Sequence, residues 1–180
     1  MSQFTDADGN LGLGSIFDLP KNVYPVGRLD LDSEGLLILT NDPNLNDKLL
    51  NPRNMHGRTY FVEVDGIPSA GAVEELKRGV MINVKGTFKT RPAVVHMLPD
   101  FSIDEREPPV NRLKHPMTSW LSITITEGKN RQVRKMTAKI GHPTLRLIRT
   151  AIEDLKLGPL KPGELTQLSR KAVYSKLNIE

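Results

Sequence analysis

The 180-residue sequence contains no cysteine. Disulfide bonds, cysteine-based zinc sites and thiol nucleophiles are therefore excluded. Long apolar runs are missing as well: a segment such as 36–39 is far shorter than the roughly 20 apolar residues of a transmembrane helix. Residues 1–9 are polar and acidic rather than basic and apolar, so we expect no secretory signal there. These absences together favour a cytoplasmic protein.

Several catalytic signatures are also missing. The four histidines are scattered along the chain and lack the spacing of zinc ligands on one helix; they are His56, His96, His115 and His142. The sequence has neither a glycine-rich phosphate loop nor a Gly-x-Ser-x-Gly elbow. Hydrolase and kinase functions therefore have no support, and the histidines are interpreted as structural or surface groups.

Positive charge is in moderate excess, with 25 Lys and Arg against 21 Asp and Glu and a pI of about 9.4. Four cations gather in Lys129–Lys135, where a helix is predicted to begin. The helix dipole makes cations there unfavourable by a few tenths of a kcal/mol each, and backbone N–H groups at such an end suit phosphate. Taken alone, the cluster could equally be a solvated face. Lys139, Arg146 and Arg149 extend it and favour a nucleic-acid surface.

The stretch 26–40 combines an acidic, glycine-containing turn with an apolar segment. Residues 36–40 are predicted to form a fully buried strand. Asp30 would then lie on the loop that leads into this strand, a position where functional residues are common. Asp32 and Ser33 are ordinary turn-forming residues, so the turn could also be purely structural. Tyr60, at the start of a predicted strand beside a basic loop, could stack on a nucleobase or belong to the core.

The remaining pattern predicts an α+β protein. Alternation over 119–126 indicates a half-buried strand, and Asn130 is expected to cap a helix over 131–140 that ends at Gly141. Residues 99–118 are expected to form an irregular loop. The other predicted strands are 23–26, 59–64, 80–84, 92–98 and 144–152, and the other predicted helices are 15–18, 70–78, 169–177 and one that begins at Asp42-Pro43. Ser69 is expected to cap the helix over 70–78, and Asp42 is expected to cap the helix that begins at Pro43. Leu45, Leu49 and Leu50 would form the apolar face of that second helix.

Three ordered motifs resemble the ribosomal-RNA pseudouridine synthases of the branch typified by the small-subunit enzyme. The motifs are Gly27-Arg28-Leu29-Asp30-Leu31-Asp32-Ser33-Glu34-Gly35-Leu36-Leu37, Glu127-Gly128-Lys129-Asn130-Arg131-Gln132-Val133-Arg134-Lys135-Met136 and Leu145-Arg146-Leu147-Ile148-Arg149. Two further segments, 3–6 and 116–121, are similar to a member of the family that acts on the large ribosomal subunit.

The resemblance implies an isomerase that flips a uridine of large-subunit (23S) rRNA out of its RNA, detaches the uracil and rejoins it through C5. It implies the pseudouridine synthase fold, a mixed and mainly antiparallel sheet with flanking helices and a central catalytic cleft. No metal or cofactor is expected, because the reaction is redox-neutral, and the protein is expected to be a monomer. We expect residues 1–180 to be one catalytic domain that lacks its first strand and has no separate RNA-binding domain.

The resemblance also implies roles for individual residues. Asp30 would be the catalytic carboxylate, either attacking the sugar or base or assisting proton removal at the ribose. Arg134 would keep Asp30 charged, and Tyr60 would stack on the uracil. Leu147, in preference to Leu145, would lie beneath the base. The other expected substrate-binding residues are Arg28, Leu29, Lys129, Asn130, Arg131 and Lys135.

Two other functions fit parts of the sequence. An RNA-binding or ribosome-assembly module on an inactive synthase scaffold would retain the basic surface, although the presence of Asp30 argues against it. A domain whose basic face binds a protein partner would leave the motif around Asp30 unexplained.

Overall fold

The computed structural model describes residues 2–180, which fold into two units with separate hydrophobic cores. Unit 1 comprises the residues up to His56 together with Arg149–Glu180, and unit 2 comprises Gly57–Ile148. The boundary at Arg149 lies inside strand β9 (Thr144–Ile152), so this strand contributes residues to both units.

Unit 2 is built on an antiparallel sheet in which β8 pairs with both β4 and β7, while β9 follows on the other side of β4. The bounds are β4 Arg58–Asp65, β7 Val94–Met97 and β8 Thr118–Ile125. The predicted alternation in β8 is confirmed, since Leu121, Ile123 and Ile125 are buried and the residues between them are half-buried. Ile123 pairs with Tyr60 on one side and with Val95 on the other.

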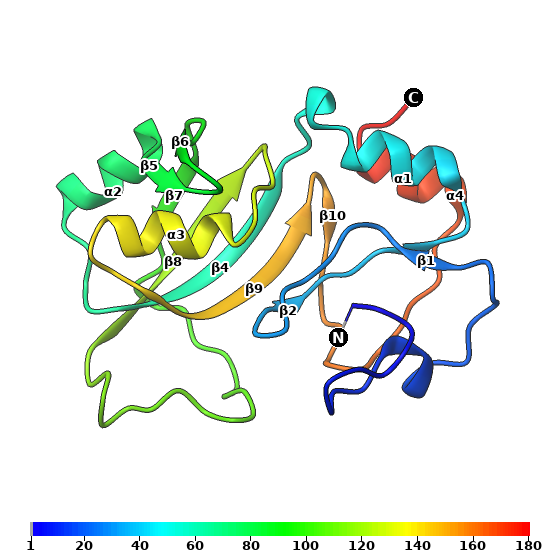
Figure 1. Ribbon diagram of the computed structural model, residues 1–180, viewed down its shortest axis with the longest axis horizontal. Helices are drawn as coiled ribbons and strands as arrows, with labels where there is room; N and C mark the ends of the chain where they lie inside the picture. The colour runs from blue at the N-terminus through cyan, green and yellow to red at the C-terminus, as the bar shows by residue number, and fades with distance from the viewer. Residues whose placement is uncertain (1) are drawn as a thin grey trace. The chain divides into compact units, whose positions relative to one another are not determined.

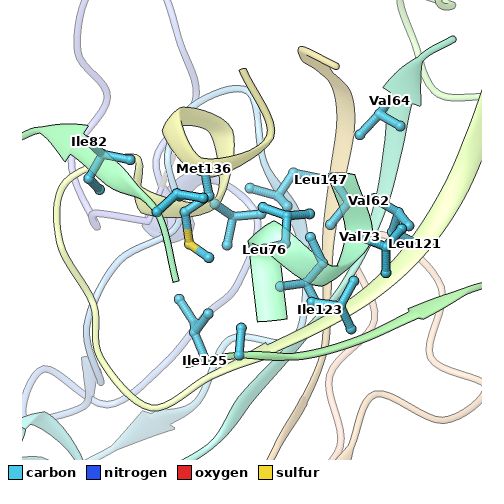
Figure 2. Packing of buried hydrophobic residues seen from close by; sticks show 14 residues of the cluster. Val62, Val64, Val73, Leu76, Ile82, Leu121, Ile123, Ile125, Met136 and Leu147 are labelled. Atoms are coloured by element: carbon cyan, nitrogen blue, oxygen red, sulfur yellow. The ribbon is translucent and has the colours of Figure 1, made fainter. Parts of the chain in front are cut away.

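The buried face of this sheet is covered by α2 (Ala70–Arg78), α3 (Gln132–Lys139) and a hairpin of β5 (Met81–Asn83) and β6 (Thr87–Lys89), as Figure 1 shows. Figure 2 shows the core between them, where Leu76 of α2 and Met136 of α3 meet Val62 and Ile123 of the sheet. The predicted cap of α2 is confirmed, because the Ser69 side chain accepts a hydrogen bond from the Ala72 N–H. This core fixes α3 against the sheet.

The other face of the sheet is covered by the irregular segment between β7 and β8. The Phe101 ring packs edge-on against Phe61 and Trp120, with centroids 4.8 and 5.0 Å apart. Beneath this segment the buried Glu63 carboxylate accepts hydrogen bonds from the Arg112 guanidinium and the Thr118 hydroxyl. The Glu63 carboxylate raises the pKa of Arg112 above its usual value. The segment predicted to be irregular is therefore anchored by aromatic and charged contacts.

Unit 1 has a smaller core, whose buried members come from the first 50 residues and from the C-terminal part of the chain: Val26, Leu36, Ile38, Leu45, Leu49, Ile152, Leu155 and Leu177. Its elements are η1 Leu13–Ser15, β1 Tyr24–Pro25, β2 Glu34–Gly35, β3 Leu39–Thr40, α1 Pro43–Leu50, η2 Pro52–Asn54, β10 Leu155–Lys156 and α4 Arg170–Lys176. The Asp42 side chain caps α1, as predicted, and also accepts a hydrogen bond from the Tyr174 hydroxyl of α4.

Three predictions for unit 1 are wrong. Residues 36–40 are not a continuous buried strand: only Leu39–Thr40 is strand, and just Leu36 and Ile38 in this stretch are buried. The short helix expected over 15–18 is instead the single 3-10 turn at Leu13–Ser15. Leu50, expected on the apolar face of α1, is exposed. Short segments of this kind lack the periodicity that separates strand from loop.

Candidate active site

The loop that carries Asp30 is closed by a tight turn, in which the Ser33 N–H donates to the Asp30 carbonyl at 2.9 Å. Asp30 itself is half-buried. Five residues further on, Gly35 has φ = +101°, and a Cβ there would lie 2.3 Å from the Arg149 carbonyl oxygen. Only glycine tolerates this conformation and this close approach. The Asp30 loop thus returns directly onto strand β9.

Arg149 holds this part of the Asp30 loop against β9. Its Nε donates to the Leu36 carbonyl at 2.8 Å, and the Leu36 N–H donates to the Arg149 carbonyl at 2.8 Å. Arg149 is buried, as is Arg146, whose Nη1 donates to the Asp104 carbonyl at 2.6 Å and whose guanidinium lies over the Trp120 ring. The prediction that these two arginines extend a basic surface is therefore wrong.

The other end of the Asp30 loop is held by the N-terminal segment. The Ser2 hydroxyl accepts a hydrogen bond from the Leu29 N–H at 2.9 Å and donates one to the Leu29 carbonyl at 2.7 Å. Leu29 lies outside any strand or helix, so the hydroxyl replaces the partners that a sheet would give its backbone. Asp30 therefore follows a residue whose N–H and C=O are both fixed. The adjacent Arg28 is exposed.

In unit 2, the turn before α3 is organised by a buried polar network. The Glu127 carboxylate accepts from the Gln132 side-chain amide at 2.7 Å and from the Arg91 N–H at 2.8 Å. The Gln132 side-chain oxygen in turn accepts from the Lys129 N–H at 3.0 Å. No role was predicted for Glu127 or Gln132 from the sequence. The signal that would have found them is a glutamate and a glutamine on the two sides of a turn, five residues apart. The network fixes the shape of the cationic turn.

The predicted cap of α3 is wrong. Arg131, not Asn130, occupies the cap position; its backbone is left-handed, with φ = +52°, and no side chain caps the helix there. Asn130 and Arg131 are exposed, whereas Arg134 and Lys135 are half-buried. Lys129 is exposed too, and its Nζ lies 5.0 Å from the centre of the Phe88 ring. The cations of the motif are thus arranged around the first turn of α3.

Tyr60 and Leu147 both adjoin the core of unit 2. Tyr60 is half-buried on the core-facing side of β4, and Leu147 on β9 is 5% exposed and belongs to the core itself (Figure 2). Leu145, two residues before Leu147, shares its face of the strand and is half-buried. The aromatic ring is therefore held by the sheet, and Leu145 has more exposed surface than Leu147.

The predicted site residues fall in both units. Arg28, Leu29 and Asp30 belong to unit 1, and the others belong to unit 2. Within each unit the structure shows how the backbone that carries them is held. The predicted pairing of Asp30 with Arg134 and the predicted central cleft join residues of different units, and both stay predictions.

Comparison with known proteins identifies the family. Residues 15–139 match the RNA pseudouridylate synthase family, a span that includes both Asp30 and the cationic motif before α3. The chain belongs to this family. It is therefore an RNA pseudouridine synthase, an isomerase that acts on RNA, and the family predicted from the motifs is confirmed.

Individual relatives agree with this assignment. Ribosomal large subunit pseudouridine synthase E of Vibrio parahaemolyticus is 47% identical over 168 residues, which cover 93% of this chain and 69% of that protein. The protein of the same name from Xanthomonas axonopodis pv. citri is 50% identical over 147 residues, which cover 81% of this chain and 76% of that protein. The predicted resemblance to large subunit pseudouridine synthase E is confirmed.

The fold agrees as well. The crystal structure of a pseudouridylate synthase superposes with a TM-score of 0.77 at 26% identity, covering 94% of this chain and 66% of that one. The chain thus spans slightly less than two thirds of that solved protein. The predicted α+β pseudouridine synthase fold with a mainly antiparallel sheet is confirmed. Among residues 2–180, no helix is both long enough and apolar enough to cross a membrane.

Proposed function

We propose that the chain converts a uridine of large-subunit (23S) ribosomal RNA into pseudouridine in the cytoplasm. The relatives named large subunit pseudouridine synthase E support this substrate. The observation that carries the proposal is the Asp30 loop, which contains a family motif. Hydrogen bonds with Ser2 hold its backbone at Leu29, and a hydrogen bond from Arg149 holds it at Leu36. A reacting carboxylate needs such fixed placement, because small displacements from the reactive geometry are costly.

The reaction breaks the N1–C1′ bond of uridine and forms a C5–C1′ bond. C5 loses a proton and N1 gains one, so no electrons enter or leave. The Asp30 carboxylate would act at the ribose or the base, either as a nucleophile or as the group that assists proton removal. Arg134 would hold that carboxylate ionised, since a neighbouring cation favours the charged form.

The uracil would be held by groups on the sheet of unit 2. Tyr60 would stack on one face of the base, a contact worth roughly 1–3 kcal/mol. Leu147 and Leu145, on the same face of β9, would form the apolar support beneath it, with Leu147 anchored in the core and Leu145 offering the more exposed surface. Base flipping costs a few kcal/mol, which stacking and phosphate contacts would offset.

The cationic turn before α3 would bind phosphates of the RNA. Lys129 and Arg131 are exposed there, and Lys135 follows one turn later. Asn130, exposed beside them, would add a hydrogen bond, and Arg28 and Leu29 of unit 1 would contact the substrate next to Asp30. Phosphate contacts of this kind position the RNA without reading its sequence.

The direct test substitutes Asp30. We expect Asp30→Ala and the isosteric Asp30→Asn to abolish pseudouridine formation in a large-subunit rRNA fragment and to leave RNA affinity nearly intact. Asp32→Asn is the matched control, because it removes one charge from the same turn, and it should retain most of the activity. Equal activity of wild type and Asp30→Asn would refute the catalytic assignment.

The substrate is tested in cells that lack the protein. Pseudouridine mapping should show that a site in large-subunit rRNA is lost and that it returns with wild type but not with Asp30→Ala. Loss of a site in small-subunit rRNA alone would contradict the large-subunit assignment. If no site is lost, the inactive RNA-binding scaffold becomes the better interpretation.

A further inference from the structure

A second group of cations lies outside the family motifs, in the segment 77–91. This segment carries five cations and no acidic residue: Lys77, Arg78, Lys85, Lys89 and Arg91. It includes the β5–β6 hairpin, to which the proposed function gives no role. The hairpin itself contributes Lys85 and Lys89 and contains no acidic residue.

The hairpin and the cationic turn before α3 are physically joined. Ile82 of β5 is buried in the core with Met136 of α3, and Phe88 of β6 packs against the same core. The Phe88 ring also supports the Lys129 ammonium, which lies 5.0 Å from its centre. Figure 1 shows the hairpin beside α3 within unit 2. The positive charges of both elements therefore act on one region of the surface.

The hairpin presents its lysines on a defined backbone. Lys85 occupies the turn in a left-handed conformation, and Gly86 donates to the Asn83 side chain at 3.2 Å while accepting from the Val84 N–H at 2.8 Å. Lys89 pairs with Met81 across the strands, on the face opposite to Phe88. Both lysines are exposed.

These cations differ from their neighbours in their partners. Lys77 pairs with Glu74 at 2.6 Å, and Arg91 lies 4.0 Å from Glu127. Across residues 2–180, no ion pair is formed by Lys85, Lys89 or Lys129, and the Lys129 ammonium lies over the Phe88 ring. No carboxylate of the described residues neutralises these three charges, so they attract an anionic partner that approaches this surface.

We infer that the β5–β6 hairpin is a second contact for the RNA backbone, in which Lys85 and Lys89 bind phosphates beyond those bound by Lys129 and Arg131. This inference rests on the proposed function, since it concerns the same RNA. The exposed outer face of the hairpin is mainly polar, with Met81 as its apolar member among Asn83, Thr87 and Lys89. Protein interfaces are depleted in lysine and depend on apolar or aromatic anchors, whereas phosphate binding needs only mobile cations.

The test measures RNA affinity of the full chain over a series of salt concentrations. The probe is the rRNA fragment that wild type modifies. The double variant Lys85→Gln/Lys89→Gln should bind it about tenfold more weakly at low salt. The slope of log affinity against log salt should become shallower by about 1.5, because each lost phosphate contact removes roughly 0.7–0.9.

The charge-matched control is Lys114→Gln/Lys161→Gln. Lys114 belongs to the segment that covers the opposite face of the unit 2 sheet, and Lys161 is an exposed residue of unit 1. This variant has the same net charge as the test variant and should keep the wild-type slope. An equal change in both variants would mean that only net charge matters, and an unchanged slope in Lys85→Gln/Lys89→Gln would refute the hairpin contact.

The outcome separates this inference from the proposed function. If wild type itself fails to bind and modify the RNA fragment, the proposed function fails. If wild type binds and modifies it and the hairpin variant has the wild-type slope, the hairpin inference alone is overturned. If the hairpin binds an acidic protein instead of RNA, the hairpin variant will likewise keep the wild-type salt slope.

Discussion

The hydroxyl of Ser2 binds both backbone polar groups of Leu29, 27 positions later in the sequence. Leu29 immediately precedes Asp30, so this one side chain fixes the peptide planes from which the proposed catalytic residue extends. A hydroxyl can do this because it donates and accepts at once. On the far side of Asp30, Arg149 and Gly35 complete the support.

Removal of this hydroxyl should impair catalysis more than binding. We expect Ser2→Ala to lower kcat by about tenfold or more, because misplacement of a reacting group by even 1 Å can cost about 100-fold. RNA affinity should change little, and Ser2→Thr should restore part of the rate. Single-turnover kinetics at saturating RNA measure the effect.

The control for Ser2 is Ser15→Ala. The Ser15 hydroxyl also serves the N-terminal segment, donating to the Asp6 carboxylate at 2.6 Å, but it has no contact with Leu29. It should therefore keep the wild-type kcat. If both variants lose rate equally, Ser2 acts through the general order of the N-terminal segment and not through the Asp30 loop.

Gly35 should be intolerant of any side chain. A Cβ at Gly35 would meet the Arg149 carbonyl oxygen at 2.3 Å and its nitrogen at 2.8 Å, at a φ of +101°. We expect Gly35→Ala to lower the free energy of unfolding by about 3 kcal/mol or more, because the new side chain would strain the backbone and displace Arg149. Gly163→Ala, at φ = +79° with no atom within 4 Å of the added Cβ, should cost only about 1 kcal/mol. Urea denaturation distinguishes the two.

The link between α1 and α4 should depend on pH. The Tyr174 hydroxyl is the main group that lowers the pKa of Asp42 below 3.8, helped by the capped N–H groups and by Arg170. A carboxyl whose pKa is lowered by folding adds stability above pH 3.8, and this stability is lost as the pH falls through the folded-state pKa. Asp42→Asn should therefore lower Tm at pH 7, and the difference from wild type should vanish once the pH falls below the folded-state pKa of Asp42. A difference that persists at low pH would show that the charge of Asp42 is not responsible.

Two substitutions in the turn before α3 distinguish the buried Glu127–Gln132 network from a helix cap at Asn130. Gln132→Ala removes the amide that binds Glu127 and the oxygen that accepts from Lys129, both in a buried network. We expect it to cost about 2–3 kcal/mol, because it leaves the buried Glu127 carboxylate with fewer donors. Asn130→Ala should change stability by less than about 0.5 kcal/mol, since Asn130 is exposed and caps nothing. A loss of about 1 kcal/mol in Asn130→Ala would instead support the cap predicted from the sequence.

The long elements were predictable because their own residues determine them. The alternation of Leu121, Ile123 and Ile125 admits only one buried face, and the Ser69 cap and the apolar positions of α2 define that helix locally. The three motifs identified the family for a different reason: ordered, specific residues around Asp30 and Arg134 do not recur by chance.

The sequence by itself determined the family, the main strands and helices, and the residues proposed for chemistry. The tertiary structure decided which cations are exposed and which contacts hold the Asp30 loop. Arg146, Arg149 and Lys89 are all cations in the sequence, but the two arginines are buried on backbone carbonyls and Lys89 is exposed. Likewise, nothing in the local sequence joins Ser2 to Leu29 or Arg149 to Leu36. These contacts depend on backbone groups left unpaired by irregular segments, and only the folded chain brings their distant partners to them.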